Sequence, residues 1–398
     1  MKQKSKFELL APAGNFPMLH SAIASGADAI YLGLKDFNMR NSAKNFTLKD
    51  LEKIRKTTKI KVYITLNTII YDSELKKIES IIKKIKQKKL ADAIICWDLS
   101  IIQLCKKYKL PFHISTQASV ANSESARFYK KLGAERIVLA RELNLNQIKK
   151  ISRIIDIECF CHGAMCVSVS GRCFTSQFQN NLSANRGQCT HPCRRAYEIT
   201  DLTDKSRKLT LENNRVMSAK DLCTLPFIEK MKKAGIKSFK IEGRSRNPEY
   251  VSIVTKAYRK ALDKNLNQKE ISQELDELKK VYNRGFSSGF YIKMPTSDDF
   301  SFSENGEQTE TKEYIGKVEK FYPKIKVALV KMHYGELKQG NEIYLTHKDT
   351  EIIKTRIKSM EINNKSVNSV KKGQDVGIKF ENESDLKKDT EIYLIKKK

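Results

Sequence analysis

The sequence predicts an α/β protein: a TIM-like (β/α)8 barrel with a cysteine-rich excursion, followed by a small C-terminal antiparallel β-barrel. Three observations support this prediction. Short apolar runs alternate with amphipathic helical patterns through the N-terminal part, six of the nine cysteines fall within residues 159–193, and the C-terminal part alternates with period two. We expect the barrel domain at 1–282, with its cluster-binding segment at 159–223, a linker at 283–312 and the second barrel at 313–398.

Eight runs in the first domain are expected to form strands, because each is short, apolar and followed by turn or loop residues. Helical patterns lie between them; Leu48, Leu51 and Ile54, for example, recur at helical spacing after Thr47, a suitable N-cap. Eight repeats favour a closed parallel barrel whose last strand lies beside the first. An open doubly wound sheet is the alternative, although no Gly-x-Gly-x-x-Gly follows the first strand. The expected strands are 7–10, 29–32, 61–65, 93–96, 112–116, 136–140, 157–160 and 238–241.

The C-terminal part predicts a different kind of barrel. Residues 283–312 are rich in Ser, Gly, Asp and Glu, which is typical of a linker. After them, Gly340-Asn341, Asn363-Asn364 and Lys372-Gly373 are turn signals between alternating segments, as expected of antiparallel strands. The expected strands are 324–329, 342–345, 352–360, 376–380 and 392–395.

The cysteine-rich stretch is the strongest chemical signal. The first residues lack the apolar core of a signal peptide, so we expect a cytoplasmic protein with reduced thiols, in which clustered cysteines bind metal. Cys166, Cys173, Cys189 and Cys193 are irregularly spaced, and no Cys-x-x-Cys knuckle occurs in the chain. This spacing favours an iron–sulfur cluster, with zinc or structural thiols as alternatives.

A further cysteine, Cys223, follows a stretch that resembles a helix start. Ser218-Ala219-Lys220-Asp221 is similar to a capping box, with Asp in place of Glu. We therefore expect Cys223 in the first turn of a helix ending near Gly235. The helix N-terminus would stabilise its thiolate.

The charge balance indicates a polyanionic partner. Lys and Arg number 75 against 46 Asp and Glu, a formal net charge of +29. No run of apolar residues is long enough for a transmembrane helix, so nucleic acid is preferred over membrane as the partner.

Polar residues follow most of the expected barrel strands, at the end where barrel enzymes carry their chemistry. Some of them are expected simply to be solvated loop residues. The polar residues at these ends are Asn38, Arg40, Asn41, Asn45, Asn67, Gln117, Arg141, Glu142, His162, Glu242 and Arg244.

Several motifs together resemble peptidase family U-32, the collagenase-like proteins. They are 9–15 (LLAPAGN), 161–166 (CHGAMC), 170–173 (SGRC), 218–223 (SAKDLC) and 240–244 (KIEGR). The resemblance extends to about residue 290. The last 85 residues resemble the family's C-terminal domain, which is similar to the second-domain barrel of translation elongation factors.

The resemblance implies an activity other than the family name suggests. Members include oxygen-independent hydroxylases with a [4Fe–4S] cluster that act on the wobble uridine of tRNA, a cytidine of the large ribosomal RNA, or a ubiquinone precursor; the RNA branches depend on prephenate. The appended barrel and Arg186-Gly187-Gln188-Cys189 look most like the tRNA branch. We therefore expect 5-hydroxyuridine formation in tRNA or another RNA, served by an unidentified electron or hydroxyl donor system.

The same resemblance implies the cluster ligands. Cluster ligands would be Cys166, Cys173 and Cys189, with Cys223 preferred as the fourth and Cys193 as its alternative. Arginines near the cluster suit carboxylates and phosphates. The expected catalytic residues are His162, Arg172, Glu242 and Arg244, and the expected substrate-binding residues are Asn41, Gln117, Arg186, Arg194, Arg195 and Lys240.

Two other classes of function compete with the hydroxylase. A cysteine protease would need a thiolate with a positioned histidine, and Cys161-His162 is adjacent in a strand, where neighbours point to opposite faces. No His-Glu-x-x-His or Gly-x-Ser-x-Gly occurs. A zinc-stapled RNA-binding protein without catalysis is the other alternative, and a ribosomal RNA cytidine remains an alternative substrate.

Overall fold

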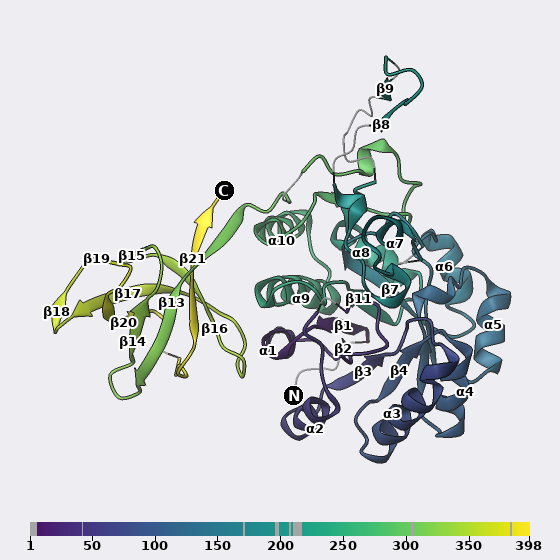
Figure 1. Ribbon diagram of the computed structural model, residues 1–398, viewed down its shortest axis with the longest axis horizontal. Helices are drawn as coiled ribbons and strands as arrows, with labels where there is room; N and C mark the ends of the chain where they lie inside the picture. Colours follow the sequence, from purple (N-terminus) through teal and green to yellow (C-terminus); the bar gives the residue numbers. More distant parts are fainter. Residues whose placement is uncertain are drawn as a thin grey trace.

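The computed structural model describes residues 6–41, 43–169, 172–195, 199–206, 208–209, 217–303, 306–382 and 384–398. It confirms the predicted fold class, since a closed parallel barrel of eight strands is followed by a closed antiparallel barrel of six (Figure 1). No helix among these residues has the length and apolar character needed to cross a membrane.

The parallel barrel closes where the sequence predicted. β11 pairs in parallel with β1 on one side, Glu8 opposite Ser238, and with β7 on the other, Ser238 opposite Glu158. The open-sheet alternative is therefore wrong. The barrel strands are β1 (Glu8–Ala13), β2 (Ala29–Gly33), β3 (Lys61–Thr65), β4 (Ala93–Cys96), β5 (Phe112–Ile114), β6 (Arg136–Val138), β7 (Asp156–Gly163) and β11 (Ser238–Ile241).

Helices cover the outside of this barrel. α2 begins as expected at the Thr47 cap, whose hydroxyl accepts from the Asp50 backbone N–H, and it buries Leu51 and Ile54. The helices are α1 (Phe16–Ala24), α2 (Leu48–Thr57), α3 (Leu75–Gln87), α4 (Leu99–Lys107), α5 (Ser123–Lys131), α6 (Leu145–Ile151), α7 (Thr175–Asn180), α8 (Ile228–Lys233), α9 (Pro248–Asp263) and α10 (Gln268–Lys280).

The excursion between β7 and β11 corrects one prediction. Cys223 lies in a strand, β10 (Asp221–Cys223), antiparallel to β7 with Cys223 opposite His162, and not in the first turn of a helix. The Asp221 backbone N–H, which a capping box would have used, instead donates to Gly285 O at 3.0 Å. Tertiary pairing therefore overrides the local capping signal, and α8 starts only at Ile228. The hairpin of β8 (Ile199–Thr200) and β9 (Lys208–Leu209) lies within the same excursion.

Much of the predicted linker is part of the barrel domain. β12 (Phe286–Ser287) pairs with β10, and the buried Tyr291 donates to Phe160 O at 2.8 Å. Farther on, the Ser301 N–H donates to Ser218 O at 2.7 Å. The chain thus stays on the first domain as far as Ser301.

The second barrel starts slightly earlier than expected, at Glu310. Its core contains Ile315, Val330, Ile343 and Ile378, and the predicted turns hold residues with positive φ, such as Gly340 and Asn364. Six strands close it: β13 (Glu310–Tyr322), β14 (Val327–Met332), β20 (Asp375–Phe380), β17 (Ile353–Ile362), β16 (Glu342–Thr346) and β21 (Glu391–Lys397). Shorter strands, β15 (Glu336–Lys338), β18 (Lys365–Ser366) and β19 (Ser369–Lys371), accompany it.

The two domains touch through polar contacts. Lys312 pairs with Glu249 of α9 at 2.7 Å, and Lys53 of α2 pairs with Asp349 at 3.0 Å. The Ile352 N–H donates to Ser21 Oγ of α1 at 3.2 Å.

The inside of the parallel barrel carries charge. Glu158 is fully buried, and its carboxylate pairs with Lys240 at 2.8 Å and Arg136 at 3.4 Å. Arg136 also pairs with Glu8, which accepts from the Tyr63 hydroxyl at 2.8 Å. Buried ions of opposite sign therefore neutralise one another across β1, β3, β6, β7 and β11.

Replacing Glu158 with Gln should destabilise the barrel domain by about 3–5 kcal/mol, because it leaves the buried Lys240 without a carboxylate partner, whereas Arg136 keeps Glu8. Glu158→Gln/Lys240→Met should recover part of this loss. Urea unfolding measures both, and Glu124→Gln, which breaks a surface pair with Arg127, is the control, with an expected change of about 0.5 kcal/mol or less. Equal stability of Glu158→Gln and wild type would contradict this account.

Candidate active site

A cavity of about 110 Å³ lies at the carboxyl ends of the barrel strands. Cys166, Cys189 and Cys193 line it, and so do side chains that follow β2, β6 and β11. Among the described lining residues, five are cationic and a single one is a carboxylate. The cations are Arg40, Arg141, Arg194, Lys240 and Arg244, and the carboxylate is Glu242.

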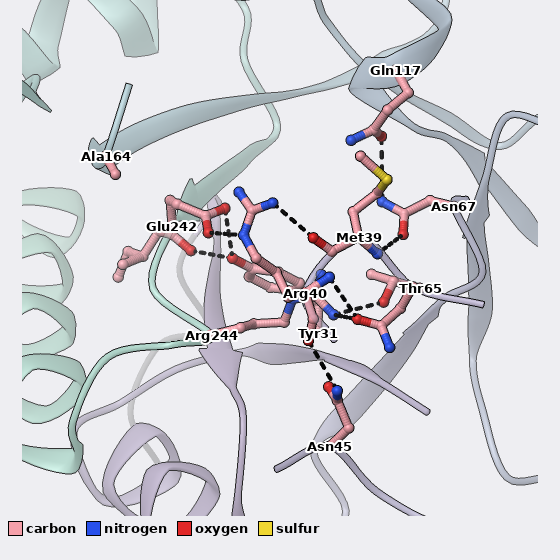
Figure 2. Close-up of polar contacts among 12 residues, drawn as sticks. Tyr31, Met39, Arg40, Asn45, Thr65, Asn67, Gln117, Ala164, Glu242 and Arg244 are labelled. Atoms are coloured by element: carbon pink, nitrogen blue, oxygen red, sulfur yellow. Dashed lines mark hydrogen bonds and ion pairs between the residues drawn. The ribbon is translucent and has the colours of Figure 1, made fainter. Parts of the chain in front are cut away.

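Glu242 is the electrostatic centre of this cavity. Arg40 Nε donates to its carboxylate at 3.3 Å, and the Tyr31 hydroxyl lies 3.5 Å from its other oxygen (Figure 2). Burial alone would raise the pKa of Glu242, but the charges of Arg40, Arg141, Arg244 and Lys240 outweigh burial and lower the pKa to about 2. Glu242 is therefore a carboxylate at neutral pH.

Neutral side chains hold the guanidinium group of Arg244. One guanidinium nitrogen donates to Asn38 Oδ1 at 3.1 Å and to Thr65 Oγ1 at 2.9 Å (Figure 2). Burial lowers its pKa to about 10, so it remains charged at neutral pH. Because no carboxylate in the described structure forms a direct ion pair with Arg244, its charge adds to the positive field of the cavity.

Three cysteines line the cavity, and a fourth, Cys173, belongs to the same segment of the chain. Cys166 is exposed, and Cys173, Cys189 and Cys193 are half-buried. Burial raises the pKa of Cys193, Arg194 lowers it, and the nearby thiols of Cys166, Cys189 and Cys173 raise it further. Among the described residues, no three His, Cys, Asp or Glu side chains form a group that could hold one metal ion.

Cys223 has different surroundings. It is buried, its thiol accepts from the Tyr258 hydroxyl at 3.7 Å, and burial raises its pKa to about 11. Its sulfur neighbour is Cys161, whose thiol contacts Lys240 O at 3.4 Å. Cys223 is not among the residues that line the cavity.

A glycine holds the cysteine segment against the barrel. Gly187 has φ +86°, and a Cβ there would lie 2.3 Å from the carbonyl oxygen of Asn38. The Asn41 N–H donates to Gly187 O at 3.1 Å. The backbone of Asn41, a predicted substrate-binding residue, thus secures the segment that carries Cys189, while its side chain is exposed.

The predicted arginines of segment 159–223 have different surroundings in the structure, and only one of them lines the cavity. Arg194 lines the cavity and donates to Ala219 O at 2.7 Å and to Met165 O. Arg172 lies over Trp97 at 4.6 Å and donates to Gln117 O at 2.6 Å, and Arg186 forms an ion pair with Glu74. Arg195 is exposed and outside the cavity lining.

Gln117 and Lys240 line the cavity as the sequence suggested, and His162 does not. His162 is buried among Tyr250, Tyr258 and Phe286, with Tyr258 Oη 3.4 Å from its Nδ1. Burial, with a smaller effect from Arg246, lowers its pKa to about 3, so it is neutral.

Some cavity residues were absent from the predicted site. Arg40 and Arg141 were recognised as polar residues after strands, but their convergence on Glu242 depends on barrel closure. Arg141 donates to Ala164 O at 2.8 Å and lies 3.9 Å over Phe160. Tyr31 reads as an ordinary strand residue, and no sequence pattern marks His191 as a residue of the cavity.

Aromatic side chains surround the mouth on the side of α7. Trp97 and Phe174 line a second cavity of about 300 Å³, which shares Met39 and Gln117 with the first. Phe174 and Phe178 are exposed, with ring centroids 6.2 Å apart. Exposed rings beside a cationic cavity are typical of sites that stack nucleobases.

Fold and site together define a barrel protein with a thiol-bearing, cationic cavity at its mouth. Residues 14–300 match the family described as "Peptidase family U32", and the chain belongs to this family. Matching relatives bear names of two kinds. A "Collagenase" of Porphyromonas gingivalis is 37% identical, covering 94% of each chain.

The other relatives are named for RNA hydroxylation. The "tRNA hydroxylation protein P1" of Bacillus subtilis is 35% identical over 79% of this chain and 77% of its own. The "23S rRNA 5-hydroxycytidine C2501 synthase" of Escherichia coli is 39% identical over 65% of this chain and 39% of its own. The expected family is confirmed, and its named members include RNA-modifying enzymes.

Glu242→Gln should destabilise the protein at neutral pH by about 3 kcal/mol, the order of magnitude that a pKa lowered from 4.5 to about 2 implies. The folded-state pKa is depressed, so this stabilisation is fully present above pH 4.5 and is lost as the pH falls toward 2. Unfolding of wild type and variant at pH 7, 5, 4 and 3 measures the difference. A difference that stays constant across this range would contradict the assigned pKa.

Proposed function

We propose that this protein is an Fe–S-dependent, oxygen-independent hydroxylase of an RNA pyrimidine, with the wobble uridine of tRNA as substrate and prephenate as co-substrate. The observation that carries the proposal is a cationic cavity at the barrel mouth that is lined by three thiols of one segment, with a fourth thiol of that segment, Cys173, within electrostatic range of Cys193. Barrel enzymes place their chemistry at this face. The relatives named for tRNA and rRNA hydroxylation support the class of reaction.

The number and type of thiols suit a four-iron cluster, in which each thiolate binds a different iron, although no three described side chains are grouped to hold a single metal ion. A [4Fe–4S] cluster is held by four Cys thiolates, commonly from separate turns of one segment. Cys193 lies within electrostatic range of Cys166, Cys173 and Cys189, and none of the four thiols is in a disulfide. We therefore propose Cys193 as the fourth ligand in place of Cys223, which is buried beside Cys161 and outside the cavity lining. When bound, the cluster would supply one-electron chemistry at the cavity.

The cavity's charge suits an anionic co-substrate. Its five cations face one carboxylate among the described lining residues, and Lys240 is already paired with Glu158. A dicarboxylate such as prephenate would find guanidinium groups in Arg40, Arg141 and Arg244. Replacing C5–H by C5–OH is a two-electron oxidation, so the co-substrate or a separate donor system must supply the oxygen atom and accept two electrons.

The aromatic and cationic side chains at the edge of the cavity support RNA binding. Single-stranded RNA is held by aromatic stacking together with cationic side chains. Trp97 and Phe174, with Arg172 lying over Trp97, offer such a surface directly beside the thiols. A base unstacked from its strand could lie there with its reacting edge toward the main cavity.

A peptidase is the second candidate, because a relative is named "Collagenase". Cys161 and His162 do not suit it, since burial raises the pKa of the thiol and lowers that of the imidazole to about 3. His191 lines the cavity with the cysteines, but burial, together with the charges of Arg40 and Arg194, lowers its pKa to about 4. Neither histidine is poised as an imidazolium partner for a thiolate, so we favour the hydroxylase.

Anaerobically purified protein should contain about four irons and four sulfides per chain. Cys166→Ala, Cys173→Ala, Cys189→Ala and Cys193→Ala should each lose the cluster, because each removes a thiolate ligand. Cys223→Ala should keep its iron and serves as the matched control. Iron and sulfide analysis with the absorption spectrum measures this.

Loss of iron in Cys223→Ala, with full iron in Cys193→Ala, would reverse the choice of fourth ligand. Full iron in all five variants, or zinc in place of iron, would overturn the cluster itself.

The substrate is tested in cells. Deleting the gene should remove one hydroxylated pyrimidine from total tRNA, detected by nucleoside mass spectrometry, and wild type should restore it. Cys189→Ala should fail to restore it, whereas Lys83→Gln on the exposed face of α3 should succeed. Loss of a hydroxycytidine from rRNA instead would identify rRNA as the substrate. An unchanged set of modified nucleosides would contradict the proposed function.

A further inference from the structure

A crevice between the two domains carries unpaired lysines. Its volume is about 670 Å³, and it lies between the start of α1 with the loop after β2 on one side and the turns before β17 and β21 on the other. Figure 1 shows α1 and α2 on the side of the parallel barrel that faces the C-terminal barrel. The lysines that line it are Lys44, Lys348, Lys387 and Lys388.

The acids of this crevice already have partners. Asp349 pairs with Lys53 at 3.0 Å, Asp389 pairs with Lys317 at 3.2 Å, and Glu391 accepts from the Tyr393 hydroxyl at 2.7 Å. In the described part of the chain, no ion pair or hydrogen bond engages the ammonium of any of the four lysines, all of which are exposed. Among the described residues, the four lysines therefore face one carboxylate, Glu391, that forms no ion pair, so the crevice has a net positive charge.

The histidines nearby do not change this balance. Burial lowers the pKa of His347, and its Nδ1 accepts from the Asp349 N–H at 3.1 Å. Burial lowers the pKa of His20 as well, with further lowering by Lys53 and Lys387. Both are expected to be neutral at pH 7, so the lysines alone provide the attraction for an anion.

The crevice is linked to the candidate active site through one loop. Lys44 lies in the loop after β2, and the next residue, Asn45, donates from its side chain to Arg40 O at 2.9 Å. Arg40 in turn pairs with Glu242 in the main cavity. The loop after β2 thus borders both the crevice, through Lys44, and the main cavity, through Arg40.

We propose that this crevice binds the phosphodiester backbone of the substrate RNA, next to the nucleotide that reacts. The inference rests on the proposed RNA-modifying function and adds the path of the RNA strand across the protein surface. Lysine ammonium groups are point charges that attract phosphates without reading bases, so this surface supplies affinity and position while the cavity supplies selectivity. The C-terminal barrel thereby contributes half of a binding surface whose other half is the parallel barrel.

The test uses full-length, anaerobically purified protein and unfractionated tRNA as the probe. Affinity is measured between 50 and 300 mM KCl for wild type and for Lys348→Gln/Lys387→Gln/Lys388→Gln. The slope of log K against log salt should fall by about 2, because each lost phosphate contact removes about 0.7–0.9 from it. The KM for RNA should rise more than kcat falls, and iron content should match wild type.

A matched control removes the same charge elsewhere. Lys76→Gln/Lys83→Gln/Lys84→Gln changes three exposed lysines of α3, and its salt slope should stay close to that of wild type. Thermal unfolding confirms that both triple variants are folded.

Three outcomes would overturn the inference. If the crevice variant and the α3 variant have the same slope, the strand does not run through the crevice, and the proposed function still stands. If the crevice variant loses affinity for inorganic polyphosphate but keeps its affinity for tRNA, the crevice holds another polyanion. If wild type binds neither tRNA nor rRNA, the proposed function fails together with this inference.

Discussion

The arrangement of the site depends on buried carboxylates that hold cations inside the parallel barrel. Glu158 neutralises Lys240 and Arg136 in the barrel interior, and two residues beyond Lys240 on the same chain stands Glu242, which binds Arg40. A barrel of this class usually fills its interior with branched apolar side chains. Here buried ion pairs accompany a small buried cluster that includes Leu10 and Ile95, and buried charges are tolerated only if each has a partner. The strand that closes the barrel therefore also fixes the charges of its mouth.

This constraint explains how the cysteine segment obtains a defined position. Glu242 holds Arg40, Arg40 belongs to the loop after β2, and the Asn41 N–H of that loop donates to Gly187 O at 3.1 Å. Gly187 fits only because it lacks a Cβ at this contact. The thiols of Cys189 and Cys193 follow directly in the chain. The position of the thiols is thus coupled through three contacts to the ion pair at Glu242.

The sequence predicted the barrel well because buried parallel strands appear as short apolar runs, and the helices between them have clear periodicity. It failed at β10, where a capping-box pattern was outweighed by pairing with β7. It also missed the first strand of the second barrel, since β13 begins with Glu-Thr-Lys-Glu and buries few side chains. Local patterns hold where local interactions decide the structure, and fail where a distant partner does.

The candidate site was predictable to the same degree. Residues within contiguous motifs, such as Cys166, Lys240 and Glu242, were found because the resemblance preserves their local order. Arg40 and Arg141 act through closure of the barrel, which brings β2 and β6 to one mouth. Whether Cys193 or Cys223 lies near the other thiols depends on how the segment between β7 and β11 folds. The spacing of the cysteines along the chain does not contain that information.

The sequence shows a large net charge of +29, but only the structure distinguishes two sets of cations that contribute to it. Of the cavity's cations, Lys240 and Arg244 are buried, and Arg40 and Lys240 are held by Glu242 and Glu158, so they can select a small anion by geometry. The lysines of the crevice are exposed and unpaired in the described structure, so they attract phosphates strongly at low salt but with little discrimination. An enzyme that modifies one nucleotide of a large RNA needs both kinds of site. The affinity for the polymer must come from outside the cavity, because only one base and one co-substrate can occupy the cavity itself.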